Sequence, residues 1–176
     1  MVLLFLFFNL DTEIFHYIHS DLKSPVLDHL NAGIEVLSTQ SSLFTAHFFL
    51  FSLGKKRERD IGKIALLSTT SVAFLSTSIK TLSNRQRPKR ESSRWDSSFP
   101  STHSAQSMSL AVIYSEKYPK LKLPLYTLSF LVGFSRVYSG EHYPSDVLFG
   151  WLLGYLTGKV FLRYEEKILR IIDRKN

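Results

Sequence analysis

Cysteine is absent from the 176-residue sequence, so disulfide bonds and thiolate metal sites are excluded, while the redox compartment stays open. Acidic residues are outnumbered: 15 Asp and Glu against 22 Lys and Arg give a formal net charge of +7. No pair of carboxylates has the pattern of glycoside chemistry, and no cluster has the ligand spacing of a zinc site. We therefore expect neither a metal nor a cofactor.

The charged residues are clustered, and long segments between the clusters are almost free of charge. Basic runs occur in GKKRERD, RQRPKRESSRWD, EKYPKLK and the C-terminal tail. Such charge is typical of nucleic-acid binding or of the flanks of membrane segments that face anionic lipid. Because the runs flank apolar segments, the sequence favours a membrane and argues against nucleic acid. Nothing indicates an obligatory protein partner.

Several apolar segments have the length of a membrane-spanning helix, which is about 17–25 residues. A further segment is shorter and more polar, but it lies between the others. The four long segments are residues 36–53, 61–79, 121–138 and 146–162, and the shorter one is 104–118. The pattern predicts an all-α fold, a polytopic membrane helix bundle of about five to six transmembrane helices.

The N-terminal stretch MVLLFLFF is too short to span a membrane and lacks the features of a secretory signal. Residues 1–20 are expected to lie in the membrane interface as amphipathic material, and a sixth span is the alternative. The whole chain, 1–176, is expected to form one domain. Its parts are an interfacial region (1–35), a transmembrane core (36–162) and a basic cytoplasmic tail (163–176).

The basic loops predict the orientation of the spans. Residues 54–60, 116–122 and the tail fall on one side, which the positive-inside tendency assigns to the cytoplasm. Residues 80–103 and 139–145 then face outward, although 80–103 is itself basic. The sequence thus predicts a multi-pass protein of the cytoplasmic (inner) membrane with its active site on the periplasmic face. An extra N-terminal span would reverse the sides.

Three polar stretches meet at one face of this topology: KTLSNRQRP (80–88), PSTH (100–103) and SRVYSGEHYPSD (135–146). Lys and Arg cations are suited to clamp a phosphoryl group and to stabilise its transition state. Ser101 is placed to N-cap the following helix, whose free N–H groups then point at an anion. This set indicates phosphoryl transfer.

The two histidines supply the remaining chemistry. His142 and Asp146 are four residues apart, so the carboxylate can approach one ring nitrogen and leave the other free as a nucleophile. His103 is expected on the opposite side of the phosphorus, where it protonates the departing oxygen. The predicted reaction is in-line transfer through a phosphohistidine.

These motifs resemble the type 2 phosphatidic acid phosphatase (PAP2) superfamily of membrane lipid phosphatases, with its pattern K-x6-RP, PSGH and SR-x5-H-x3-D. The resemblance covers about residues 36–162. It implies that His142 is the nucleophile, Asp146 its orienting carboxylate and His103 the general acid. It also implies a phosphate-binding set made of Lys80, Arg87, Ser101, Thr102 and Arg136.

Thr102 stands where that superfamily usually has glycine. Its N–H can still donate, but a β-branched residue does not readily adopt a positive φ. Slower turnover or a slightly different loop shape is therefore expected.

Other features have simpler interpretations. Alone, Lys80 or Arg136 would be an interfacial anchor; jointly, the motifs are too specific for that. The remaining histidines, His16, His19, His29 and His47, receive no catalytic role. Gly150, Gly154 and Gly158 recur every four residues and predict a close helix-packing face.

The resemblance implies a lipid phosphatase acting on lipid A 1-phosphate or phosphatidylglycerophosphate, with undecaprenyl diphosphate and phosphatidate as further candidates. Surplus cations favour a highly charged head group, and the candidate head-group contacts are Arg85, Lys89, Arg90 and Arg94. The alternatives are a lipid-to-lipid phosphotransferase, a vanadium-dependent haloperoxidase, and a non-catalytic protein that binds anionic lipid or forms part of a channel or transporter.

Overall fold

The computed structural model describes residues 2–39 and 54–173, with side chains from residue 9 onward. Helices are the only regular secondary structure in these ranges. They are α1 (Val2–His16), a π-helical turn η1 (Tyr17–Asp21), α2 (Pro25–Leu37), α4 (Lys56–Ser83), α5 (Thr102–Lys117), α6 (Lys122–Tyr138), α7 (Pro144–Arg163) and α8 (Glu165–Asp173), with short 3-10 turns η2 (Arg94–Asp96) and η3 (Pro119–Leu121). The all-α prediction is confirmed.

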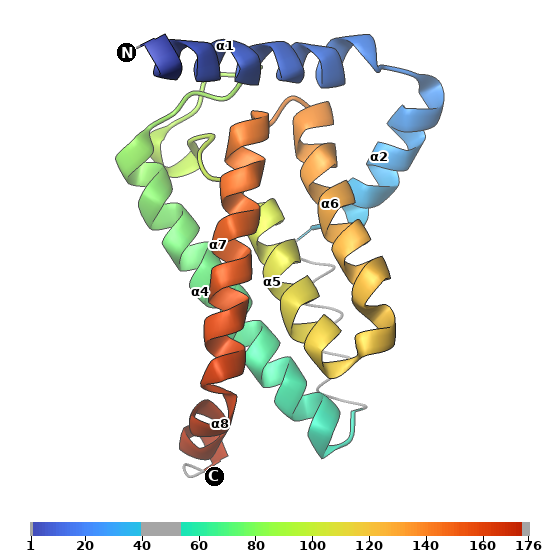
Figure 1. Cartoon of the computed structure of the whole chain (residues 1–176), viewed down its shortest axis with the longest axis vertical. Helices are drawn as coiled ribbons and strands as arrows, with labels where there is room; N and C mark the ends of the chain where they lie inside the picture. Colours follow the sequence, from blue (N-terminus) through green and yellow to red (C-terminus); the bar gives the residue numbers. More distant parts are fainter. Residues whose placement is uncertain (1, 40–53, 174–176) are drawn as a thin grey trace.

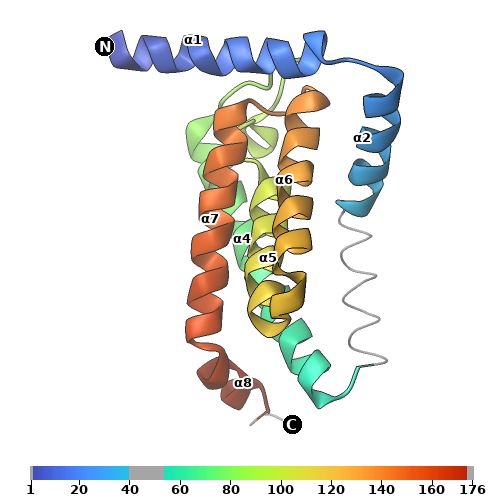
Figure 2. The same ribbon diagram turned by 45° about the vertical axis from the view of Figure 1, so that its right-hand side comes forward.

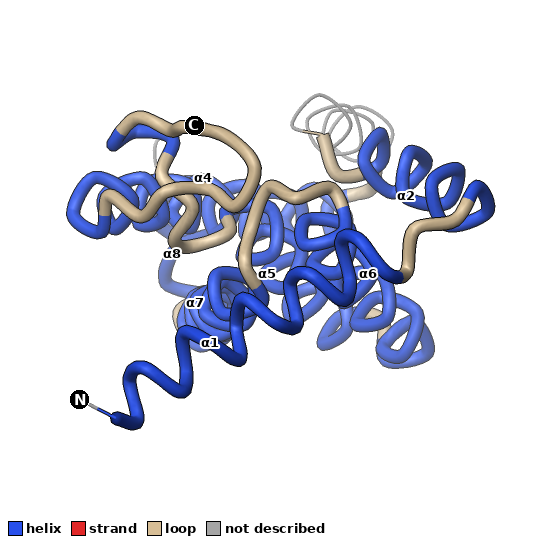
Figure 3. The backbone as a smooth tube through the Cα atoms, turned by 90° about the horizontal axis from the view of Figure 1, so that it is seen from above, coloured by secondary structure: helices blue, strands red, loops and turns tan. Residues whose placement is uncertain are grey.

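Four of the helices, α4 to α7, form an elongated bundle (Figure 1). Helix α1 lies across one end of it, as the view from above shows (Figure 3). Helix α2 runs alongside α6 (Figure 2), and α8 lies at the end opposite α1. The bundle helices cover the apolar segments expected at 61–79, 104–118, 121–138 and 146–162. The expected segment 36–53 lies mostly outside the described residues.

None of the helices in the described ranges combines the length and the apolar character needed to cross a membrane. The interior of the bundle contains buried serines beside apolar side chains such as Ile64 and Ile113. The hydroxyls of Ser68 in α4 and Ser109 in α5 are 2.7 Å apart and fully buried. Such hydrogen bonds between helices satisfy buried polar groups.

Helices α5 and α7 pack most closely, through the glycine face that the sequence predicted. A Cβ atom built on Gly154 would lie 2.0 Å from the carbonyl oxygen of Ala105. A Cβ on Gly158 would lie 3.0 Å from the side chain of Val112. Glycine at these positions lets the two backbones approach, so the helix-packing interpretation is confirmed.

At the end of the bundle near α1, the residues that end α4 and α6 and begin α7 suit the backbone conformations found there. Asn84 follows α4 in the left-handed conformation, with φ of 46°, which Asn tolerates better than most residues. Gly140 follows α6 with φ of +79°, and Pro144 begins α7 at a position where no backbone N–H is needed. All three polar motifs are thereby placed at one end of the bundle.

Candidate active site

Lys80 and Arg87 of the first motif are both largely buried. Lys80 lies in the last turn of α4, and its Nζ donates to the carbonyl oxygen of Ser97. Arg87 donates to carboxylates on two sides, to Asp96 at 2.6 Å and to Glu141 at 2.8 Å. These bonds hold both cations in place without a substrate.

Arg136, at the end of α6, faces the N-terminal part of the chain. Its Nη2 donates to the carboxylate of Glu35 in α2 at 2.8 Å. Glu35 also accepts a hydrogen bond of 2.5 Å from the hydroxyl of Ser139. Glu35 of α2 is thus the counterion of Arg136. A bound phosphate would compete with Glu35 for this guanidinium.

His142 is fixed in the tautomer that a nucleophile requires. Its Nδ1 lies 2.7 Å from the carbonyl oxygen of Ser98, which can only accept, so Nδ1 carries the proton. Nε2 then presents its lone pair, and it lies 3.3 Å from Nη1 of Arg87. A phosphate bound to Arg87 would therefore be adjacent to the nucleophilic nitrogen.

Asp146 lies near this ring, but its Oδ2 is 3.8 Å from Nδ1, which is too far for a hydrogen bond. Its carboxylate is completely buried. Oδ2 accepts from the Tyr143 N–H at 2.8 Å and from the hydroxyl of Ser98, and Oδ1 accepts from Arg85 at 2.6 Å. Ser98 thus contacts both Asp146 and His142, and it links the carboxylate to the ring.

The second motif begins α5 as the sequence predicted. Ser101 is the N-cap, and its hydroxyl accepts from the backbone N–H of Ser104. Its own N–H donates to the Asp146 carbonyl oxygen at 3.0 Å, which joins the second and third motifs. Thr102 is the first helical residue, and among the described non-glycine residues only Asn84 has a positive φ. The threonine therefore causes no backbone strain here.

Burial, and then the cations of the site, lower the pKa of both histidines, which lie outside the apolar segments. Burial, followed by the charge of Arg136, lowers the pKa of His103 to about 4. Burial also lowers the pKa of His142; the charges of Arg87 and Lys80 act in the same direction and Asp146 opposes them. Burial next to Arg87 lowers the pKa of Lys80 to about 8. Both imidazoles are therefore neutral near pH 7.

The four surplus cations have different environments. Arg85 donates to Asp146 at 2.6 Å and to Asp11 of α1 at 2.7 Å. Arg90 is half exposed and lies 2.7 Å from Asp96. Lys89 and Arg94 are exposed. The side chain of Arg85 is thus directed into the protein framework, whereas the other three lie toward the surface.

Two apolar cavities adjoin the motif residues. One, of about 210 Å³, is lined by residues of α5 and α6 that include His103, Leu110, Leu128 and Val132. The other, of about 630 Å³, is lined mainly by Phe99, Leu148, Phe149 and Leu152 beside Arg85. Both have the apolar lining that a hydrocarbon chain requires.

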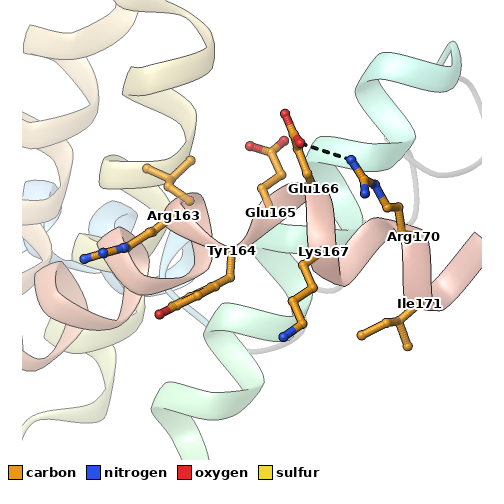
Figure 4. Close-up of a pocket in the computed structure, with 8 residues that line it drawn as sticks. Arg163, Tyr164, Glu165, Glu166, Lys167, Arg170 and Ile171 are labelled. Atoms are coloured by element: carbon orange, nitrogen blue, oxygen red, sulfur yellow. Dashed lines mark ion pairs between the residues drawn. The ribbon is translucent and has the colours of Figure 1, made fainter.

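A third cavity, of about 670 Å³, lies around α8 at the opposite end of the bundle (Figure 4). Its side chains are mostly charged, and Glu166 and Arg170 pair across one turn at 3.5 Å. None of the motif residues lines it. Its size therefore does not make it a candidate for the predicted chemistry.

Sequence reasoning missed several residues that contact the motifs. Ser98 orients both His142 and Asp146, Glu35 pairs with Arg136, and Asp11 pairs with Arg85. The signals were a hydroxyl-rich stretch before PSTH and isolated carboxylates in otherwise apolar N-terminal segments. Within the described ranges, no three His, Asp, Glu or Cys side chains are gathered as metal ligands.

Comparison with known proteins places the fold and motifs in a family. Residues 62–170 match the PAP2 superfamily. The chain is 32% identical over 78 residues to the undecaprenyl-diphosphatase BcrC of Bacillus subtilis, which is 44% of this chain and 40% of that protein. The matched segments span less than half the length of the curated relatives.

Two solved structures are similar over nearly their whole length. The crystal structure of Aquifex aeolicus LpxE has a TM-score of 0.77 and 30% identity, with 88% of this chain and 96% of that chain covered. A transmembrane PAP2-type phosphatidylglycerolphosphate phosphatase from Bacillus subtilis has a TM-score of 0.74 and 28% identity, with 95% and 96% covered.

Proposed function

The chain belongs to the PAP2 superfamily, and on that premise we propose that it is a metal-independent lipid phosphatase that works through a phosphohistidine on His142. The single observation that carries this proposal is the tautomer of His142. Nδ1 donates its proton to Ser98, and Nε2 is directed to Arg87. A nucleophilic nitrogen next to a phosphate-binding cation is the arrangement that the first step requires.

In that step the Nε2 lone pair attacks phosphorus and a P–N bond forms. The P–O bond to the lipid breaks, and the departing oxygen takes a proton from His103. The neutral His103 then removes a proton from water, which attacks the phosphohistidine and releases phosphate. Lys80, Arg87 and Arg136, with the N–H groups that follow Ser101, stabilise the equatorial oxygens throughout.

For this cycle His103 must be protonated when the substrate is bound. Burial is the largest cause of the His103 pKa of about 4, and the charge of Arg136 adds to it. A phosphate dianion on the motif cations would offset the part of the lowering that comes from their positive charge, so substrate binding favours the protonated acid. Binding of the lipid phosphate thereby raises the pKa of His103, which is the proton donor for the departing oxygen.

Exposed apolar side chains on the outside of the bundle favour a lipid environment. Helix α7 exposes a row of large apolar side chains at four-residue spacing, namely Leu148, Leu152, Leu156 and Val160, each more than half exposed. Phe74 of α4 is 73% exposed and Leu123 of α6 is 78% exposed. Apolar faces outside and serine hydroxyls inside are typical of helices packed in lipid.

We therefore retain the proposal of a polytopic protein of the inner membrane with the motif end on the periplasmic side. The basic loops at the start of α4 and the end of α5 lie together at the other end, where Arg57 donates to the Lys117 carbonyl oxygen at 3.1 Å. Introduced cysteines in residues 90–98 would report the side, since the chain has no native cysteine.

As substrate we propose lipid A 1-phosphate or phosphatidylglycerophosphate first, and undecaprenyl diphosphate or phosphatidate next. The surplus positive charge that favours a strongly anionic head group is carried at the surface by Lys89, Arg90 and Arg94. The side chain of Arg85 instead pairs with Asp11 and Asp146.

The test is phosphate release by purified protein from a panel of these four lipids in the presence of EDTA. His142→Ala is the inactive variant, and His29→Ala is the matched control because the His29 ring is exposed and bonds to the Pro25 carbonyl oxygen of its own helix. Release that survives EDTA, persists in His29→Ala and disappears in His142→Ala supports the proposal. Full turnover by His142→Ala would refute the mechanism, and transfer to an added lipid acceptor would indicate a phosphotransferase.

A further inference from the structure

A chain of charged contacts leads from the N-terminal helix to the active site. Asp11 of α1 pairs with Arg85 at 2.7 Å, and Arg85 pairs with Asp146 at 2.6 Å. Asp146 in turn contacts the His142 ring at 3.8 Å. Arg85 occupies an unspecified position of the first motif, and Asp11 lies outside all three motifs.

Asp11 is the member of this series of contacts that lies farthest from His142, and its side chain is only 4% exposed. Its Oδ1 accepts the backbone N–H of Ser145 at 2.8 Å, and its Oδ2 accepts the Ser145 hydroxyl at 2.6 Å in addition to Arg85. A buried carboxylate is costly unless it is fully paired. Both Asp11 oxygens are paired, and their partners are Arg85 and the residue immediately before Asp146.

Arg85 joins the two carboxylates through the planar fork of its guanidinium. Nη2 donates to Asp11, and Nη1 donates both to Asp146 and to the Ser145 hydroxyl. The guanidinium also lies 4.2 Å from the centre of the Tyr143 ring. A lysine carries the same charge but cannot hold this two-sided geometry.

The backbone of Arg85 completes the arrangement. Its carbonyl oxygen accepts the Ser98 N–H at 2.7 Å, and Ser98 is the residue whose carbonyl oxygen receives the Nδ1 proton of His142. Arg85 thus holds Asp146 with its side chain and the partner of His142 with its backbone.

We propose that Asp11 and Arg85 are positioning residues for the reaction, and that α1 is thereby part of the active-site framework. They fix Asp146 and the first turn of α7, so that the His142 ring stays aimed at the phosphorus. The inference rests on the proposed function for its kinetic test, but the geometry can also be tested without turnover.

The kinetic test compares Asp11→Asn with Glu13→Gln, an exposed carboxylate on the same helix. We expect Asp11→Asn to lower kcat about 10- to 100-fold, as loss of a supporting partner of a catalytic group does, with KM little changed. Glu13→Gln should stay within about twofold of the wild type. Arg85→Lys should also lose kcat, because the charge alone does not restore the fork.

The second measurement is the pKa of the His142 ring by 15N NMR of histidine-labelled protein in detergent. The ring faces Asp146, Arg87, Lys80 and His103, all of which are unchanged in the variants. Removing the anion in Asp11→Asn should lower this pKa, and removing the cation in Arg85→Gln should raise it. A role confined to packing would not give shifts of opposite sign.

The outcomes are separable. If Asp11→Asn keeps the kcat of Glu13→Gln, or if both variants shift the His142 pKa in the same direction, the positioning role is refuted. If the wild type releases no phosphate from any lipid, the proposed function fails, and the NMR shifts alone decide whether the network controls His142. Melting curves of each variant in detergent exclude unfolded samples from either comparison.

Discussion

The two ends of the helix bundle carry the same kinds of charged residue in opposite environments. At the α1 end the side chains of Arg87 and Asp146 are 8% and 0% exposed, whereas at the α8 end those of Arg170 and Glu166 are 82% and 89% exposed. A buried charge needs defined partners and so acquires a fixed position. An exposed ion pair is screened by water and fixes little. Of these two ends, the α1 end is therefore the one whose charged side chains are held in fixed positions.

The largest contrast is expected between matched arginines at the two ends. Arg87→Gln should lower kcat/KM about 10²- to 10³-fold, because it removes a donor aimed at charge that develops in the transition state. Arg170→Gln should stay within about twofold of the wild type, as exposed substitutions do. Phosphate release from the best lipid of the panel measures both. Equal losses would remove the distinction between the ends.

The pH dependence sharpens the same contrast. The low pKa of His103, about 4, means that its protonated fraction in the free enzyme falls as the pH rises. We expect the kcat/KM ratio of wild type to His103→Ala to fall by up to about tenfold per unit between about pH 5 and 7. The ratio removes the ionisation of the substrate itself.

Arg136→Gln should move this fall to higher pH, because the guanidinium is the largest charge that lowers the pKa of His103. The same ratio measured in the Arg136→Gln background reports the shift. A ratio that is constant over the whole window would contradict the assignment of His103 as the acid.

The smallest expected effects are changes in stability at the interface between α5 and α7, two helices that run between the ends of the bundle. Gly154→Ala should destabilise the protein by about 1–3 kcal/mol, because the added methyl group meets the Ala105 backbone and overpacks the interface. Gly33→Ala in α2 meets nothing within 4 Å and should stabilise by about 0.5–1 kcal/mol. Denaturant unfolding in detergent measures the free energy of unfolding of both variants. Equal changes would argue against close packing of α5 and α7 at Gly154.

Much of this architecture could be predicted from residue patterns. The apolar segments gave the bundle helices, Ser101 predicted the N-cap of α5, and the glycine repeat of α7 predicted its closest contact. These features depend on local periodicity and on capping chemistry, which are written within a few neighbouring residues. Thr102 begins a helix without a positive φ, so the conformation open to glycine is not needed there, and slower turnover stays a prediction.

The contacts of the motif residues were not predictable in the same way. Spacing indicated a bond between His142 and Asp146, but the Nδ1 proton goes to the Ser98 carbonyl oxygen. Arg85 was expected to contact a head group and instead joins Asp11 to Asp146, so its head-group contact stays a prediction. Side chains from distant segments compete for each donor, and sequence spacing does not reveal that competition.

The sequence by itself determined which residues are candidates for the proposed chemistry, because nucleophile, acid and cations are proposed from side-chain type and short motif spacing. The tertiary structure decided how they are held. It brings Asp11 to Arg85 across 74 residues of chain and to Ser145 across 134. Buried charges must find partners wherever the fold places them, and that requirement, which acts through space and not along the chain, sets the geometry of the site.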